Sequence, residues 1–257
     1  MHSKMKRAGE QILFYGLLVL IWQIGFALRL APPEMLPSPG RVMESLWRGF
    51  ADRSFLSGLA VSVRRIALGY GVSVAIGVGL GFLLATSGFL NRTLGRLMLG
   101  LQSLPSLCWL PLAVLWFGRS ESAILFVVLI GSVLAVAINT ELGVRHVPRI
   151  YLQAGKNMGA RGMALFSQIL FPASMPHLIA GLKQGWAFAW RGLISGEMIF
   201  VSLGLGHLLM MGRDLNDMSQ VMAVMVLIML LGVTVDRAVF HLLEKRIQRR
   251  WGLVQNE

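Results

Sequence analysis

The chain has 257 residues, of which 55% are hydrophobic and only 14% are charged, and its mean hydropathy is +0.66. A soluble domain carries about 25% charged residues, and a domain of this length cannot bury so much apolar surface in one core. This composition excludes an ordinary soluble enzyme and a disordered chain, and the single cysteine excludes a disulfide scaffold, so the predicted fold class is an all-α polytopic membrane protein.

A transmembrane helix needs about 20 mostly apolar residues, and the sequence contains six such stretches. They are predicted at 11–28, 65–87, 97–117, 122–141, 176–201 and 219–241. The first follows Lys4, Lys6 and Arg7, and a basic start of this kind also occurs in cleaved signal peptides. The length of the apolar run and the lack of a clear small-residue cleavage site favour a retained anchor span.

The net charge of +12 would also suit a nucleic-acid-binding protein. If the amino terminus is inside, the cytoplasmic segments are 1–10, 88–96, 142–175 and the tail after about 237; they carry 14 basic residues, with five acidic residues in or next to them. The opposite side carries eight basic and six acidic residues. Because an excess of Lys and Arg on cytoplasmic segments is general in membrane proteins, no nucleic-acid partner is expected, and both termini are predicted to be cytoplasmic.

The connection 29–64 contains one predicted element. Ser38 and Pro39 form a suitable cap and first-turn pair for a helix. Apolar residues then recur at helical spacing, namely Val42, Met43, Leu46, Trp47 and Phe50. The pattern predicts a short amphipathic helix, which either lies on the outer membrane surface or packs against the bundle.

Two spans carry residues that affect packing. Small residues recur every four positions in the second span, at Gly69, Ser73, Gly77 and Gly81. Such a stripe allows close helix approach, either within one subunit or at a subunit interface. In the third span, Pro105 and Pro111 each remove a helix hydrogen bond. This predicts a kinked helix beside a transport path or a merely bent packing helix.

The longest cytoplasmic segment, 142–175, is predicted to be structured. Pro148 can begin a helix and Gly159 can end it in a left-handed cap. A second short helix is expected from about Gly162, stopping before Pro172. Connecting loops usually have about 4–6 residues, so a longer loop of two short helices indicates a docking element.

This segment resembles the EAA loop of ABC importer permeases, whose pattern is Glu-Ala-Ala, three residues, Gly, nine residues, Ile-x-Leu-Pro. The corresponding residues are Gln153, Ala154, Gly155, Gly159, Ile169, Phe171 and Pro172. Gln153, Gly155 and Phe171 depart from the pattern, whereas the spacing of the glycine and the proline is kept. The stretches MLPSPGRV at 35–42 and LPSLCWLPLAVLWFG at 104–118 are similar to the nitrate, sulfonate and taurine branch of the family.

The resemblance covers about 35–250 and implies a type I importer core built from a homodimer. One membrane domain, 1–257, would comprise the anchor span 11–28, a permease core at about 56–241 and the coupling loop 142–175. Each loop would dock on a cytoplasmic ATPase subunit that holds ATP and Mg²⁺. An extracytoplasmic binding protein would deliver a small anion, such as a sulfonate, taurine, nitrate or bicarbonate, across a bacterial inner membrane.

The chain itself would then be a transport subunit without enzymatic activity. The sequence has no Gly-x-x-x-x-Gly-Lys-Ser/Thr phosphate loop and no His-Glu-x-x-His metal motif, and its five histidines are scattered. Neither a cofactor nor a metal is therefore expected on this chain.

Charges inside a membrane span are costly and indicate function. Trp190, Arg191 and Glu197 in the fifth span are the candidate path residues, with Arg191 suited to attracting an anion. The family often has Glu at the position of Glu197. The alternative is that Arg191 and Glu197 are structural; six residues place them about 240° apart around a helix, so each would bond to a neighbouring helix. Lys183 is expected to extend its ammonium group to the lipid headgroups.

Two other functions are considered. A secondary transporter would favour matching halves with broken helices, and the sequence shows no internal repeat. A membrane-integral enzyme would need a cluster of polar catalytic groups at one membrane depth, which the sequence also lacks. The sequence does not identify the transported solute.

Overall fold

The computed structural model describes residues 2–32, 34–200 and 203–250, and within these ranges every regular element is a helix. Five helices are long and apolar enough to cross a membrane, and one bent pair makes a sixth candidate span. These features confirm the predicted all-α class with about six spans. The chain divides into two compact units, Met1–Ala60 with Leu203–Met229 and Val61–Ser202 with Leu230–Glu257.

The first unit contains the predicted anchor span. Its elements are α1 (His2–Ala27), α2 (Pro39–Ala51), the start of α3 (Ser54–Thr86), α11 (Leu205–Asp214) and most of α12 (Met218–Val235). The indole Nε1 of Trp22 donates to the carbonyl oxygen of Pro37 at 2.9 Å. This bond ties the last turns of α1 to the segment that leads into α2.

Helix α2 is the predicted amphipathic helix. The Ser38 hydroxyl accepts a hydrogen bond from the backbone N–H of Arg41 at 3.3 Å, and Pro39 occupies the first turn, as expected from the sequence. Val42 is buried, whereas Met43 and Trp47 are 66% and 76% exposed. Met43 and Trp47 therefore form an open apolar side on the helix.

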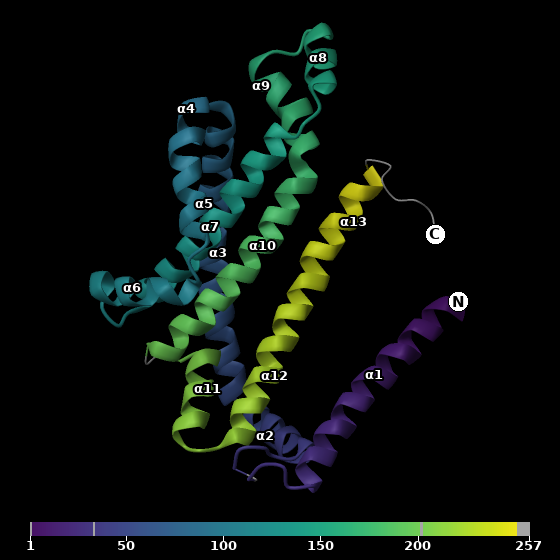
Figure 1. The fold of residues 1–257 in the computed structure, drawn as a ribbon, viewed down its shortest axis with the longest axis vertical. Coiled ribbons are helices and arrows are strands. Elements are labelled where there is room, and N and C mark those ends of the chain that lie inside the picture. Colours follow the sequence, from purple (N-terminus) through teal and green to yellow (C-terminus); the bar gives the residue numbers. More distant parts are fainter. Residues whose placement is uncertain (1, 33, 201–202, 251–257) are drawn as a thin grey trace. The chain divides into compact units, whose positions relative to one another are not determined.

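The second unit is built around α7 and α10, which run side by side (Figure 1). Besides most of α3 and the end of α12, its elements are α4 (Gly88–Leu90), η1 (Asn91–Gly95), α5 (Arg96–Gln102), η2 (Ser106–Trp109), α6 (Leu110–Phe117), α7 (Glu121–Arg145), α8 (Arg149–Asn157), α9 (Gly162–Leu165), η3 (Phe166–Leu170), α10 (Phe171–Ile199), η4 (Asp236–Phe240) and α13 (His241–Arg250). Apolar side chains of α7, including Ile124, Val127 and Val128, are completely buried and form the centre of the core.

Small residues allow α3 and α10 to approach α7 closely. A Cβ atom on Gly77 of α3 would lie 2.8 Å from Val136, and one on Gly185 of α10 would lie 2.6 Å from the same valine. A Cβ on Gly69 would lie 2.8 Å from Val128. The glycine stripe of the second span therefore packs within one subunit, which was one of its two predicted roles.

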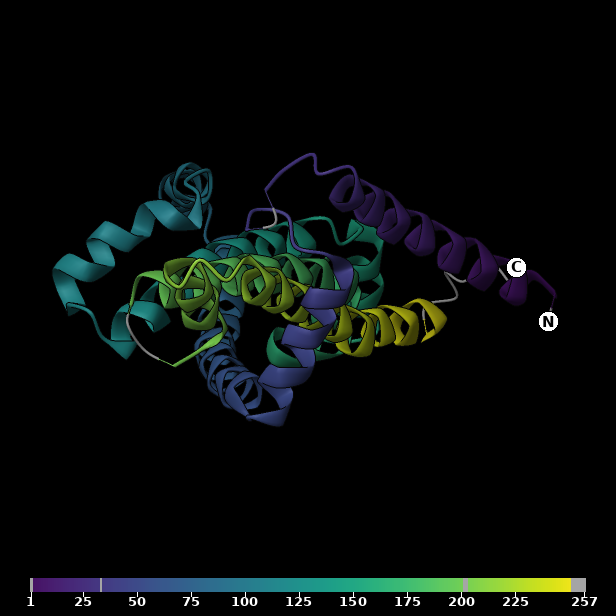
Figure 2. The same ribbon diagram turned by 90° about the horizontal axis from the view of Figure 1, so that it is seen from below.

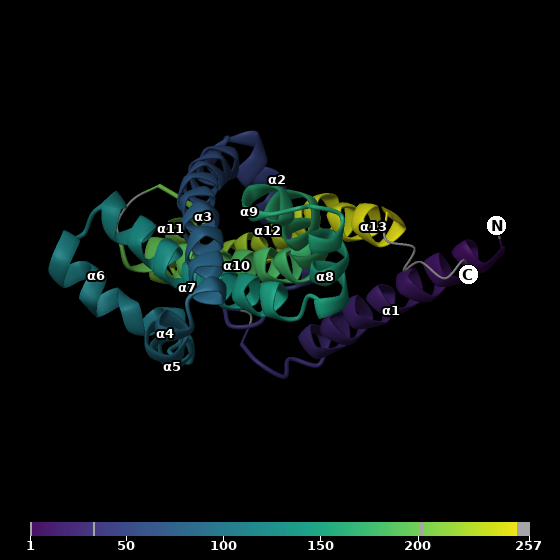
Figure 3. The same ribbon diagram turned by 90° about the horizontal axis from the view of Figure 1, so that it is seen from above.

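The third predicted span is not one kinked helix. Gly88–Gln102 and Ser106–Phe117 are separate helical pieces that meet at an angle of 104°. Pro105 lies in the break, and Pro111 lies in the first turn of α6, where its missing N–H leaves no helix bond unmade. Figures 2 and 3 show α6 turning away from α5 before the chain returns into α7.

Two predicted boundaries are also wrong. Helix α3 begins at Ser54 rather than near 65, so the preceding connection is shorter than expected. The second short helix of the loop does not stop before Pro172, because α9, η3 and α10 form one helical run, Gly162–Ile199. Within it, η3 is a π-helical turn in which the N–H of Phe171 reaches back to the carbonyl of Phe166. This wider turn lets the helix pass Pro172, which has no N–H to donate. The fifth predicted span ended at 201, outside the described residues.

Candidate functional site

The loop between α7 and α10 folds into a helical hairpin, which Figure 1 shows beyond the ends of these two helices. Helix α8 follows Pro148 and ends in a Schellman motif. In this motif Gly159 has a φ of +88°, its N–H donates to the carbonyl of Lys156 at 3.0 Å, and the N–H of Ala160 donates to the carbonyl of Gly155 at 2.9 Å. The left-handed conformation predicted for Gly159 is confirmed.

The structure divides the seven candidate coupling residues into three groups. Gly155 and Ile169 meet between the two arms of the hairpin, where a Cβ on Gly155 would overlap the end of the Ile169 side chain. Gln153, Ala154 and Gly159 are exposed on α8 and its cap. Phe171 and Pro172 are half-buried at the start of α10. The set therefore comprises an internal contact, an outer surface and a junction with the bundle.

The hairpin also exposes apolar side chains that the sequence pattern did not single out. Ile150, Met158 and Met163 are 67%, 79% and 76% exposed, and Tyr151 is 47% exposed. Apolar residues inside a basic loop are the only sequence signal for this surface. Exposed apolar groups on one element are typical of a protein interface.

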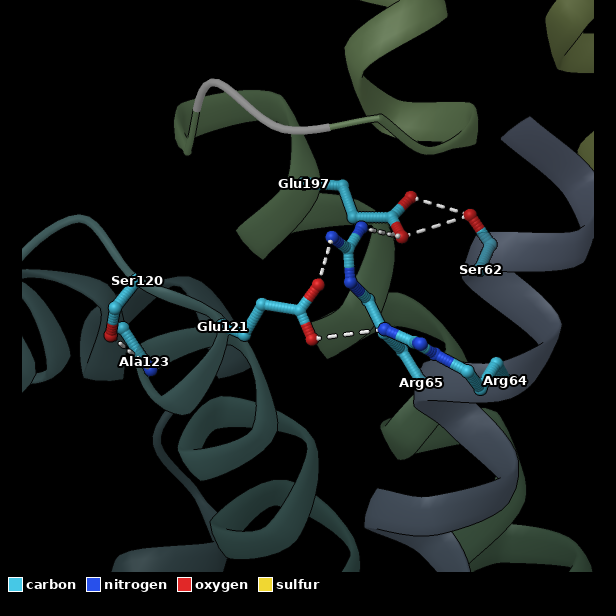
Figure 4. A network of polar contacts seen from close by, with 7 residues as sticks. All are labelled: Ser62, Arg64, Arg65, Ser120, Glu121, Ala123 and Glu197. Atoms are coloured by element: carbon cyan, nitrogen blue, oxygen red, sulfur yellow. Dashed lines mark hydrogen bonds and ion pairs between the residues drawn. The ribbon is translucent and has the colours of Figure 1, made fainter. Parts of the chain in front are cut away.

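A polar cluster joins α3, α7 and α10 elsewhere in the second unit (Figure 4). The hydroxyl of Ser62 lies 2.9 and 2.7 Å from the two carboxylate oxygens of Glu197. Arg65 donates from Nη1 to Glu197 Oε1 at 2.9 Å and from Nη2 to Glu121 Oε1 at 2.8 Å. Arg64 Nη2 lies 3.4 Å from the other oxygen of Glu121.

One ion pair of the cluster is buried and another is exposed to solvent. The side chains of Arg65 and Glu197 are 3% and 0% exposed, whereas those of Arg64 and Glu121 are 63% and 50% exposed. Exposed ion pairs contribute about 0–1 kcal/mol, but breaking a buried pair costs about 3–5 kcal/mol because one charge is left uncompensated. The pair between Arg65 and Glu197 therefore fixes α3 to α10, and the contacts of Glu121 add less.

The three candidate path residues point to different surroundings. Glu197 is bound to Arg65 and Ser62, as described above. Arg191 is exposed on α10, where its Nε donates to the carbonyl of Ala187 at 3.0 Å and its guanidinium lies 4.8 Å from the centre of the Phe188 ring. Trp190 is half-buried and stacks on Trp186, with ring centroids 6.1 Å apart. Sequence reasoning missed Arg65 because the arginine was placed at the edge of its span.

Two further sequence expectations concern polar side chains. Lys183 was expected to reach the lipid headgroups; the structure shows its ammonium group 3.2 Å from Asp236 and 3.8 Å from Glu244. The rings of His146 and His177 lie 5.5 Å apart, although they are far apart in the sequence. Among the residues described, no three His, Cys, Asp or Glu side chains gather as metal ligands.

Comparison with known proteins identifies the family to which this architecture belongs. The family described as the inner membrane component of binding-protein-dependent transport systems matches residues 77–249. An ABC transporter permease protein of Methanocaldococcus jannaschii is 31% identical over 235 residues, covering 90% of this chain and 88% of that protein. The nitrate import permease of Synechocystis is 26% identical over 236 residues (88% and 85% covered), and the taurine transport permease of Escherichia coli is 27% identical over 243 residues (91% and 86%).

Solved structures share the fold. A methionine ABC transporter matches with a TM-score of 0.61 at 17% identity, covering 75% of this chain and 95% of that one. An amino acid ABC transporter matches with a TM-score of 0.64 at 16% identity, covering 78% and 97%. The expected importer-type core is confirmed. The chain therefore belongs to the family of inner-membrane components of binding-protein-dependent transport systems, as a multi-pass transport subunit rather than an enzyme.

Proposed function

We propose that this chain forms the path through which a small anionic solute is imported by ATP-driven alternating access. Its partners are a second copy of the chain, two cytoplasmic ATPase subunits that hold ATP and Mg²⁺, and an extracytoplasmic binding protein. The names of the relatives that import nitrate and taurine support this class of solute. The chain acts as one membrane domain, 1–257, with the span 11–28 as anchor and about 56–241 as permease core.

The observation that carries the proposal is the hairpin of α8 and α9. It presents the exposed side chains of Ile150, Met158 and Met163 outside the apolar bundle. Burial of these side chains by an ATPase would remove apolar surface from water, which is favourable. The contact of Gly155 with Ile169 joins the two arms, so that a force on the tip is passed on to α7 and α10.

Arg191 supports an anionic solute. It is exposed within a helix long and apolar enough to span a membrane, and a charge at that depth faces a bundle interior or a water-filled cavity rather than lipid. We place Arg191 on the path as the group that attracts the anion. Trp190 supports α10 next to it, and Glu197 acts through its pair with Arg65 by holding α10 in position.

The proposed orientation follows the charge distribution. The hairpin and both termini are cytoplasmic, and the segments 29–53 and 203–217 face the outside. In this orientation the cluster of Arg64, Arg65 and Glu121 lies in the outer half of the membrane domain, because Glu121 is the first residue of α7, at the end opposite the hairpin, and Arg64 and Arg65 lie in the first half of α3.

Reconstitution tests the function. The chain is purified with its co-purifying ATPase, placed in proteoliposomes with the binding protein outside and ATP inside, and supplied with labelled nitrate or taurine. Uptake that requires both ATP and the binding protein is expected. A preparation that brings no ATPase with it, or uptake driven by an ion gradient without ATP, would instead support the alternative of a secondary transporter.

A further inference from the structure

The carboxylate of Glu121 is held between two arginines. Each of its oxygens faces a different guanidinium, with Arg65 Nη2 at 2.8 Å and Arg64 Nη2 at 3.4 Å. The two arginines are consecutive residues of α3, and Glu121 is the first residue of α7. Figure 4 shows one contact from each carboxylate oxygen of Glu121, one to Arg65 and the other to Arg64.

We propose that Arg64 and Arg65 form a binding site for a small oxyanion, and that Glu121 occupies this site when no solute is present. This inference rests on the proposed function, because it takes the transported solute to be an anion. Nitrate, bicarbonate and sulfonates share with a carboxylate two or more oxygens on one central atom. Arginine side chains recognise that arrangement through parallel N–H donors.

The two acidic partners of Arg65 differ in how easily they can leave. Glu197 is fully buried and is also bound by Ser62, so its departure would leave a charge uncompensated inside the protein. Glu121 is half-exposed and can turn its carboxylate into water. An incoming anion can therefore replace Glu121 on Arg64 and Arg65 while Arg65 remains neutralised by Glu197.

The net charge of the cluster explains why an anion binds only when Glu121 leaves. Arg64, Arg65, Glu121 and Glu197 together are neutral, so an anion gains little until Glu121 moves away. Glu121 lies next to both guanidiniums in the same molecule, so it competes with a free anion as an intramolecular ligand. Dilute free anions are therefore excluded, whereas an anion released next to the site by a binding protein is present at a high local concentration and can compete. Arg64 and Arg65 thus form an anion site on the outer part of the proposed path, which Glu121 closes to dilute anions.

The test is direct binding of sodium nitrate and sodium methanesulfonate to the purified permease–ATPase complex, by isothermal titration calorimetry at constant ionic strength. Glu121→Gln removes the competing carboxylate and keeps its shape, so nitrate affinity should rise at least tenfold. Adding Arg64→Gln to this variant should abolish the gain. Glu44→Gln, which removes an exposed acid paired with Arg48 at 3.0 Å on α2, should match the wild type.

A folded Glu121→Gln complex with wild-type affinity for both anions overturns the proposal. If that variant does not assemble, Glu121→Asp provides the same comparison, because the shorter carboxylate cannot reach both arginines, and an unchanged affinity is again contrary. Uptake adds a second measurement. Glu121→Gln should lower both KM and kcat, because the anion binds more tightly and is released more slowly from the site. A purely structural defect would reduce the amount of complex and leave KM unchanged.

Failure of this site can be distinguished from failure of the proposed function. If the wild type imports nitrate with ATP but Glu121→Gln shows no gain in nitrate affinity, only the proposed anion site of Arg64 and Arg65 is wrong. If the wild type imports no anion, the proposed function fails. The titration still decides whether Arg64 and Arg65 bind an oxyanion.

Discussion

Arg65 on α3 and Glu197 on α10 form an ion pair of 2.9 Å that is almost completely shielded from solvent. Both helices also approach the same residue of α7, Val136, through Gly77 and Gly185. An ion pair in this position costs desolvation energy, which its geometry and the Ser62 bond offset. The ion pair therefore specifies how α3 and α10 are aligned, and it adds little net stability.

This pairing gives the first prediction. Arg65→Met should destabilise the protein by about 3–5 kcal/mol, because Glu197 is left buried without its cation. Arg65→Met combined with Glu197→Met should recover most of that loss, because two apolar side chains then replace the pair. Thermal unfolding of the purified protein measures both effects, and additive losses in the double variant would contradict the coupling.

The second prediction concerns Gly159. Its φ of +88° strains any branched residue, and no atom lies near enough to crowd a Cβ, so the effect acts through the backbone. Gly159→Val should cost about 1–3 kcal/mol of strain and weaken ATPase docking ~5- to 150-fold. Gly159→Asn is the control, because Asn tolerates this conformation. Wild-type pull-down and uptake with valine would refute the coupling role.

The third prediction compares two glycines of α3. A Cβ on Gly77 meets Val136 at 2.8 Å, whereas one on Gly79 meets nothing within 4 Å. Gly77→Ala should therefore destabilise the bundle by about 1–3 kcal/mol through overpacking. Gly79→Ala should be neutral or stabilising by up to about 1 kcal/mol, because alanine favours a helix. Equal unfolding temperatures for the two variants would show that α3 does not need this close approach.

The fourth prediction concerns orientation. Cysteines are introduced singly at Ser54 and Ser167 after Cys108, which is exposed, has been replaced by serine. An impermeant reagent added to intact cells should label Ser54→Cys and not Ser167→Cys, because the hairpin is placed in the cytoplasm. Labelling after cell disruption confirms that both sites are reactive. The reverse pattern in intact cells would invert the topology.

The fifth prediction concerns Arg191. Arg191→Ala should reduce kcat/KM for anion uptake by roughly 10- to 150-fold, the range of a lost hydrogen bond to a charged group at about 1.5–3 kcal/mol. Arg191→Lys should restore part of the activity. Because Arg191 is exposed, ATPase assembly should remain intact. Normal uptake by a correctly assembled Arg191→Ala complex would remove this residue from the path.

Local signals in the sequence predicted local structure correctly. Ser38 caps α2, Pro148 precedes α8, and Gly159 ends it, because each of these effects depends on a few neighbouring residues. Residues distant in the sequence were harder to place. No local pattern indicated that Glu197 would meet Arg65, and the π-helical turn before Pro172 depends on a register shift that periodicity does not reveal.

The uninterrupted helical run Gly162–Ile199 carries both the hairpin residue Met163 and the span residue Arg191. At 1.5 Å per residue its 38 residues follow a helical path about 57 Å long. The two ends belong to one continuous backbone, so a movement at one end can be passed to the other along the helix itself, through the π-helical turn of η3. In the proposed orientation Met163 lies on the cytoplasmic side, and a displacement of Met163 by the ATPase would reach Arg191 through the same helix.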